Sequence, residues 1–227
     1  MTTGTEPFGV FDAVIFDFDG TLADSHASMM RAYRVFAEEY GVSLEDMDRF
    51  TGMPTEAVAR ALLPADVAQA AGRRIDDLEC SNTEGVVALP GALAALEAIP
   101  EGRKAIATSC TQRLITARMA AAGLPMPRVV VPRETVTHGK PAPDSFVRAA
   151  ELLGFDPSRC VVVEDAPAGV AGARAAGCAV IGILTGHDAD ELGADLSVES
   201  LADLDFKVVD SGVRVSLASI QAAVTSG

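Results

Sequence analysis

The stretch FDAVIFDFDGTLADS, residues 11–25, decides the fold. Its apolar run Val14-Ile15-Phe16 is typical of a strand buried on both faces of a parallel sheet. Asp17 then lies at the carboxyl end of that strand, which is the edge where open α/β sheets bind their ligands. Asp19 follows two residues later, and Gly20 lets the chain turn away sharply. Because two carboxylates this close repel each other, we expect them to share a cation.

Composition indicates a well-packed protein with an acidic surface. The chain has 227 residues, of which 49% are hydrophobic and 22% charged, so it can bury a substantial core. The net charge of −14 disfavours binding to the phosphate backbone of nucleic acid and to anionic membranes. No apolar run reaches the roughly 20 residues of a membrane span. We therefore expect neither nucleic acid nor membrane as a partner.

Four widely spaced cysteines, Cys80, Cys110, Cys160 and Cys178, form no Cys-x-x-Cys pair. They are typical of reduced thiols rather than of a disulfide framework or a zinc site. The N-terminus lacks the basic start and apolar stretch of a signal peptide. We expect a soluble cytoplasmic protein that is a monomer or a weak homodimer.

The periodicity of the chain predicts two kinds of region. From residue 27 to about residue 88 only helical patterns occur, beginning with a helix over 26–41. After Pro90, strands at 105–109, 129–131, 160–163 and 179–184 alternate with helices at 91–99, 111–122, 143–154 and 167–177. This alternation predicts a parallel sheet with helices on both faces. Near the C-terminus, residues 206–209 and 213–217 could close a small hairpin.

Polar residues follow further strands at the edge where Asp17 lies. They are Thr108-Ser109, Lys140 in the next loop, and Glu164-Asp165. Each signal is weak alone: the hydroxyls could cap a helix, Lys140 could be a solvated loop residue, and the acids could precede the helix at Pro167. Taken together and in this order, they predict one crevice in which all these groups converge.

These residue types suit phosphate-ester chemistry. Asp17 would attack phosphorus and form an aspartyl-phosphate, and Asp19 would give and then take a proton. Thr108 and Lys140 would hold the phosphoryl oxygens. Four carboxylates against one lysine leave an excess of negative charge, for which Mg²⁺ is the natural partner. Its expected ligands are Asp17, the backbone carbonyl of Asp19, and Asp165, with Glu164 binding directly or through water.

In this order the motifs resemble those of the haloacid-dehalogenase-like superfamily of phosphohydrolases, over nearly the whole chain. The resemblance implies an α/β fold, with a doubly wound, Rossmann-like parallel sheet core at 1–26 and 89–227. It also implies an inserted α-helical cap at 27–88 that closes over the site. The likeness is greatest to sugar and polyol phosphatases, in the stretches 89–92, 107–109, 139–141 and 163–169. It implies a small phosphorylated metabolite as substrate, bound by Gly20, Thr21, Ser109 and Cys110.

Two departures from that family pattern lie near the expected phosphate site. Cys110 stands where a small residue, usually glycine, follows the Thr-Ser pair. Pro132-Arg133-Glu134-Thr135 replaces a more typical Thr-Ala-Glu-Asp run. Either departure could change the rate or the substrate preference.

A phosphosugar mutase is the nearest alternative, since it shares Asp17 and Asp19. The resemblance implies that such mutases carry a histidine in the first cap helix and an arginine after a cap glycine. This chain has Met29 at the first place, and Gly52-Met53-Pro54-Thr55 lacks the arginine.

Other classes are less favoured by the sequence. A dehalogenase needs neither a metal nor a second acid. A phospho-receiver signalling domain lacks both the Asp-x-Asp-Gly-Thr spacing and the helical insert. A nucleotide-binding domain would need a different glycine spacing from that of residues 169–177.

Overall fold

The computed structural model describes residues 7–48 and 55–218, and its centre is a six-stranded parallel sheet. The strand order is β6 (Val130–Val131), β5 (Lys104–Ala107), β2 (Ala13–Phe16), β7 (Cys160–Glu164), β8 (Ala179–Ile183), β9 (Leu196–Val198). The predicted α/β fold is therefore confirmed. Strand β9 was not predicted; it is only three residues long, and its pairing with β8 depends on a long-range contact.

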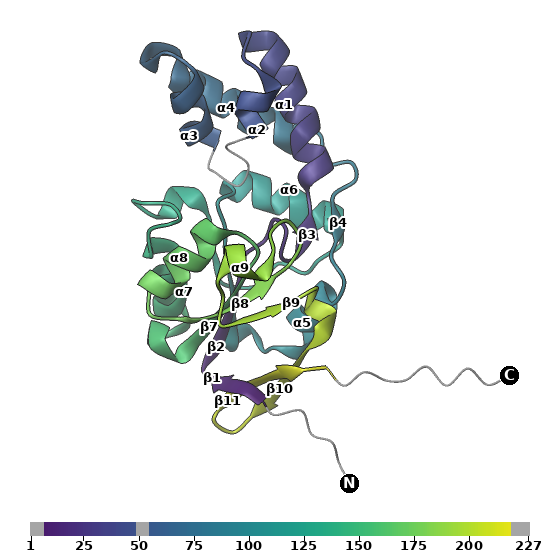
Figure 1. Ribbon diagram of the computed structural model, residues 1–227, viewed down its shortest axis with the longest axis vertical. Helices are drawn as coiled ribbons and strands as arrows, with labels where there is room; N and C mark the ends of the chain where they lie inside the picture. The colour runs from purple at the N-terminus through teal and green to yellow at the C-terminus, as the bar shows by residue number, and fades with distance from the viewer. Residues whose placement is uncertain (1–6, 49–54, 219–227) are drawn as a thin grey trace, which may run out of the picture.

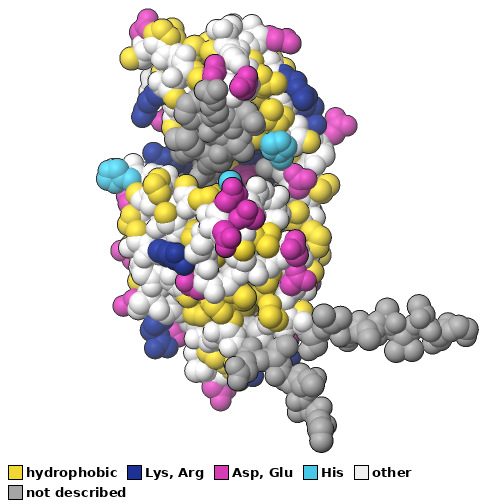
Figure 2. Space-filling view, in the orientation of Figure 1, with side chains coloured by type: hydrophobic (Ala, Val, Ile, Leu, Met, Phe, Trp, Pro, Cys, Tyr) yellow, Lys and Arg dark blue, Asp and Glu magenta, His cyan; other side chains and the backbone are white. Residues whose placement is uncertain are grey.

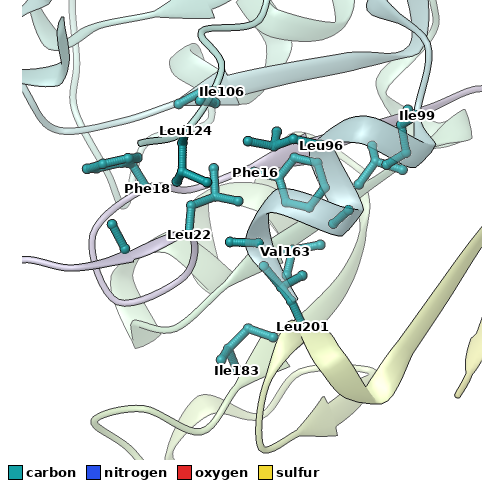
Figure 3. Close-up of a cluster of buried hydrophobic side chains, with 14 of the residues drawn as sticks. Phe16, Phe18, Leu22, Leu96, Ile99, Ile106, Leu124, Val163, Ile183 and Leu201 are labelled. Carbon is teal, nitrogen blue, oxygen red and sulfur yellow. The ribbon is translucent and has the colours of Figure 1, made fainter. Parts of the chain in front are cut away.

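Each face of the sheet is covered by its own helices and its own hydrophobic cluster. Val14 and Phe16 pack with α5 (Ala92–Ala98) and α6 (Gln112–Ala122), as Figure 3 shows around Phe16. Their neighbours Ala13 and Ile15 point to the opposite face, toward α7 (Asp144–Leu153) and α8 (Pro167–Ala175). All four residues of β2 are buried, which is the reason for their unbroken apolar run.

A small antiparallel sheet flanks the core at the end opposite the helical block described below. It consists of β1 (Pro7–Phe11), β11 (Gly212–Leu217) and β10 (Leu204–Val209), in that order. The predicted C-terminal hairpin is confirmed as β10–β11. The strand expected at Val14–Phe16 is confirmed as β2, which begins at Ala13, whereas β1, ending at Phe11, was not predicted. Pairing with β11, which is remote in sequence, decides this division.

Four helices follow the first strand of the core and form the helical block, α1–α4. Their bounds are α1 (His26–Tyr40), α2 (Leu44–Asp48), α3 (Thr55–Leu62), α4 (Ala65–Ser81). They share a cluster of their own, with Tyr33, Phe36, Met47 and Ile75 among its buried members. In Figure 1 the helical block lies at the top, at the far end of the molecule from β1, β10 and β11.

The two chain segments that join the helical block to the core run side by side. Strand β3 (Ala23–Asp24) pairs antiparallel with β4 (Val87–Ala88). No strand was expected between residue 27 and about residue 88, so β4 corrects that prediction. A two-residue pairing has no periodicity to detect, and it forms because the chain leaves and re-enters the core at one place.

Short helices complete the fold. They are η1 (Glu101–Arg103), η2 (Arg133–Thr135), η3 (Pro157–Arg159), α9 (Ala189–Leu192), η4 (Leu201–Asp203). Among the helices within residues 7–48 and 55–218, none has both the length and the apolar character that crossing a membrane requires. Figure 2 shows acidic side chains spread over the visible face of the core and of the helical block, in line with the net charge of −14.

Candidate active site

Asp17, Lys140 and Glu164 meet at the carboxyl edge of the parallel sheet. The amide of Asp17 continues the ladder between β2 and β7 by donating to the carbonyl of Val163 at 2.9 Å. Lys140 Nζ donates to Asp17 Oδ1 and, at 2.7 Å, to Glu164 Oε1. The three side chains are between 1% and 9% exposed, so the lysine is a buried cation shared by two carboxylates.

The pKa values of Asp17 and Lys140 are both raised above their ordinary values. Burial raises the pKa of Asp17 to about 7, with Glu164 adding to the effect and Lys140 opposing it. Burial by itself would lower the pKa of Lys140, but Asp17 and Glu164 together raise it above its ordinary value. Lys140 is therefore a permanent positive charge beside Asp17.

Two glycines leave the space that the acidic side chains occupy. Gly20 has φ +82°, and a Cβ there would lie 2.0 Å from Asp165 Oδ2. Gly169 is on α8, and a Cβ there would lie 1.6 Å from Glu164 Oε1. Any side chain at either position would displace a carboxylate of the site.

Asp17, Glu164 and Asp165 bring three carboxylate oxygens within 4.8 Å of one another. Burial, followed by the charges of Glu164 and Asp17, raises the pKa of Asp165 well above its usual value. Such an arrangement is costly without a cation, and clustered carboxylate oxygens are the donors that Mg²⁺ prefers. The residues present therefore fit a divalent metal.

Glu164 differs from the other two acids in this cluster. Its Oε2 accepts from the amides of Asp165 and Ala166 at 2.8 and 2.7 Å, and its Oε1 accepts from Lys140. Both of its oxygens are thus already engaged by the protein.

The carboxylate of Asp19, which lines the same cavity, is held by a second set of donors. Its Oδ1 accepts from Ser25 Oγ and from Arg118 Nη1, the latter at 2.8 Å, and its Oδ2 lies 2.9 Å from Cys110 Sγ. Within the protein, Lys140 is the cation paired with Asp17, and Arg118 is the cation paired with Asp19. The metal that the two residues are expected to bind stays a prediction.

The two hydroxyls after β5 face different surroundings. Thr108 is 3% exposed, and its Oγ1 accepts from the amide of Cys110 at 3.0 Å. Ser109 and Cys110 line the cavity in front of Asp17. Accepting this bond leaves the Thr108 hydroxyl its own proton to donate.

A cavity of about 820 Å³ joins the sheet edge to the helical block. On the core side it is lined by Asp17, Gly20, Ser109, Lys140, Asp165 and other residues of the same edge. On the other side it is lined by Met29, Tyr33, Thr55, Glu56, Asp76, Glu79. Both halves of the molecule thus line one cavity.

The remaining sequence expectations fall around this cavity. Thr21 is buried, and its Oγ1 lies 3.5 Å from Asp165 Oδ1. Arg133 and Glu134, from the run that departs from the family pattern, line the cavity. Met29 also lines it. Residues 52–54, on which part of the argument against a mutase depends, lie outside the described residues.

Sequence reasoning missed Ser25 as a partner of Asp19, Gly169, and the pair Arg118–Glu79. A signal for the pair was available. Arg118 follows Leu114 and Ile115 at helical spacing, and Glu79 follows Ile75. A charge within the apolar stripe of a helix indicates a buried, paired group.

The family model described as haloacid dehalogenase-like hydrolase matches residues 14–183. The chain therefore belongs to this family of hydrolases, and the predicted membership is confirmed.

Similar proteins include several phosphatases that act on small phosphate esters. Hexitol phosphatase A of Escherichia coli is 40% identical, over 84% of this chain and 91% of its own length. Glycerol-1-phosphate phosphohydrolase 2 of Saccharomyces cerevisiae is 30% identical, over 88% of this chain and 87% of its own length. A protein named beta-phosphoglucomutase, from Mycobacterium bovis, is 30% identical over 85% of this chain and 90% of its own length.

Among solved structures, a hydrolase from Pseudomonas syringae has a TM-score of 0.76 and 26% identity, covering 85% of this chain and 95% of its own. These similarities together support the predicted class of enzyme, a phosphoric monoester hydrolase.

Proposed function

We propose that the protein is a Mg²⁺-dependent phosphatase that hydrolyses a small sugar or polyol phosphate through an aspartyl-phosphate. The observation that carries this proposal is the buried Asp17–Lys140–Glu164 constellation beside Asp165, which opens into a cavity of about 820 Å³. The names of the similar phosphatases support the substrate class.

In the first step, a carboxylate oxygen of Asp17 bonds to phosphorus while the bond from phosphorus to the ester oxygen breaks. Asp19 gives its proton to the departing alkoxide. In the second step, Asp19 takes a proton from water, whose oxygen attacks phosphorus and frees both inorganic phosphate and Asp17. Lys140 holds a phosphoryl oxygen throughout.

We assign the second oxygen-holding hydroxyl to Thr108, as the sequence predicts. Its Oγ1 accepts from the amide of Cys110 and keeps its own proton to donate, and Ser109 beside it lines the cavity. Gly20, Thr21 and Cys110 shape the phosphate end around it.

Asp17, Asp165 and the backbone carbonyl of Asp19 would hold Mg²⁺, with Glu164 acting through water because both of its oxygens already accept from the protein. When bound, the metal would neutralise charge on the phosphoryl group as a Lewis acid.

We further propose that residues 27–88 form a cap over the core at 1–26 and 89–227, and that the helical block reads the non-phosphate end of the substrate. A cap in this place also excludes water from the site. The four cysteines are all free, which supports a reducing, cytoplasmic location.

The test is phosphate release from a panel of hexitol, glycerol and sugar phosphates, with Mg²⁺ or with EDTA. We expect release only with Mg²⁺, and a loss of at least about 10³-fold in kcat for Asp17→Asn. Asp12→Asn is the matched control, because Asp12 lies at the other end of β2 and pairs with Arg159 on the surface. Its activity should stay near that of the wild type.

Three outcomes would contradict the proposal. Undiminished release by Asp17→Asn would show that the nucleophile is another group. Conversion of a sugar 1-phosphate to its 6-phosphate without release would identify a mutase. Stable phosphorylation by acetyl phosphate without turnover would identify a receiver domain.

A further inference from the structure

Arg118 is a buried arginine that bridges Asp19 to the helical block. It lies on α6, and its side chain is 4% exposed. Nη1 donates to Asp19 Oδ1 at 2.8 Å, and Nη2 donates to Glu79 Oε1, on α4, at 2.9 Å. One guanidinium thus joins a carboxylate of the core to a carboxylate of the helical block.

The energetics of this position argue against a purely structural role. Taking a guanidinium and its carboxylates out of water costs several kcal/mol per ion, and an apolar side chain of similar size is often as stable or more stable in such a place. Leu114 and Met119 occupy neighbouring buried positions on the same helix. Within residues 7–48 and 55–218, Arg118 Nε has no hydrogen-bond partner, so the guanidinium is anchored through its two terminal nitrogens.

Arg118 also holds the other donor to Asp19. Nη1 lies 3.3 Å from Cys110 Sγ, and that sulfur lies 2.9 Å from Asp19 Oδ2. With Ser25 Oγ on Oδ1, both carboxylate oxygens are engaged and the plane of the carboxylate is set. This arrangement gives Cys110 a role that its replacement of a small residue did not indicate.

We propose that Arg118 is the positioning residue of Asp19, and that Glu79 fixes Arg118 from the helical block. The inference rests on the proposed function, in which Asp19 gives its proton to the leaving alkoxide as the bond to phosphorus breaks. The carboxylate left by that transfer already has a donor on each oxygen. Because Glu79 belongs to α4, placement of the helical block and orientation of Asp19 are coupled.

A comparison of leaving groups tests this role. An alkoxide needs a proton as it departs, whereas nitrophenolate is a stable anion that can leave unprotonated. We compare kcat/KM for the best polyol phosphate of the panel with kcat/KM for p-nitrophenyl phosphate, since this parameter reports the steps up to cleavage of the ester. Arg118→Met should shift the ratio of the two values by about tenfold against the polyol phosphate.

Two further variants at these positions calibrate the result. Asp19→Asn should shift the same ratio more strongly, by about 10²- to 10⁴-fold, because it removes the acid itself. Arg118→Lys should restore part of the loss, since an ammonium can still reach one carboxylate oxygen.

Arg113→Met is the matched control. Arg113 is also on α6 and also pairs with α4, through Asp76 and Asp77, but it is 56% exposed and does not contact Asp19. It should alter both kcat/KM values by a common factor and leave their ratio unchanged.

Equal losses on both substrates for Arg118→Met, or a ratio shift as large for Arg113→Met, would overturn the proposal. If Arg118→Met does not fold, as judged by thermal melting, Glu79→Ala provides the same comparison with a smaller expected shift in the ratio. Absence of phosphate release by the wild type from every ester would instead reject the proposed function, so the two failures are distinguishable.

Discussion

The two ends of the cavity are built differently. At the core end, Asp17 and Lys140 are 9% exposed and Glu164 is 1% exposed, and each is held by a strand end or by a hydrogen bond to one. At the helical end, Glu56 is 57% exposed and Asp76 is 13% exposed, and both project from helices. At these positions the core end is more deeply buried than the helical end.

This difference in burial indicates which end suits transition-state stabilisation and which suits substrate discrimination. Charges that act on a transition state are most effective when they are fixed and shielded from water, as at the sheet edge. Groups that discriminate between substrates need only reach the variable part of the ligand. They can therefore lie on helices whose sequence changes without disturbing the sheet.

Lys140→Met is expected to have the largest effect on activity, because it removes the cation at the core end of the cavity while keeping a side chain of similar volume. Asp17 and Glu164 would then face each other without their shared partner. We expect kcat/KM for a polyol phosphate to fall by about 10²- to 10³-fold, measured by steady-state phosphate release.

Lys104→Met is the control for burying a methionine in place of a lysine. Lys104 is 7% exposed, and its Nζ donates to the carbonyls of Leu96 and Ile99, away from the cavity. This variant should lower the Tm with kcat/KM near the wild-type value. A comparable loss of activity in both variants would contradict the special role of Lys140.

Glu79→Gln tests the contact between the helical block and the core, where Glu79 pairs with Arg118, through the pH dependence of stability. Burial raises the pKa of Glu79 to about 7, although Arg118 opposes the shift. Between the ordinary value of 4.5 and about 7, the unfolded chain ionises first, so this group costs stability as the pH rises. The free energy of unfolding of the variant should equal that of the wild type near pH 4.5. Above pH 7 it should be higher than that of the wild type, by up to about 3 kcal/mol.

The measurement is denaturant unfolding of both proteins across that pH range. A wild type that gains stability relative to Glu79→Gln as the pH rises would show that the pairing with Arg118 outweighs burial.

Glu56→Gln should have the smallest effect, because the side chain is exposed and its charge is screened. Removing this charge from the helical end should relax discrimination against an ester that carries a second phosphate. We expect the ratio of kcat/KM for a monophosphate to that for the matching bisphosphate to change by about three- to tenfold.

Asp66→Asn removes one charge from the helical block at an exposed position on the first turn of α4, and it serves as the control. If both variants change the ratio equally, the effect comes from overall charge and not from the cavity.

Much of the core followed from local pattern. The unbroken apolar runs of β2, β5 and β7 indicated buried parallel strands, and Gly41, Gly123 and Gly154 ended helices in the left-handed conformation that such glycines favour. The acids after β2 and β7 and Lys140 in the loop after β6 were predicted to converge, because the carboxyl ends of parallel strands share one edge. Lys140 and Asp17 are in contact there, 123 positions apart in sequence.

Other features had no local signal. Strand β9 and the β3–β4 pairing are too short for a period to appear, and they exist because distant segments lie side by side. The division between β1 and β2 depends on β11, some 200 residues away in sequence.

The sequence by itself determined the class of fold, the edge where the polar residues gather, and the kinds of group available for chemistry. Only the tertiary structure decided how those groups are shared. It paired Lys140 with Asp17 and with Glu164, paired Arg118 with Asp19, and brought Arg118 to Glu79. The physical reason is that periodicity reports which face of an element is buried, whereas partner choice among buried charges depends on distances between elements that are remote in sequence.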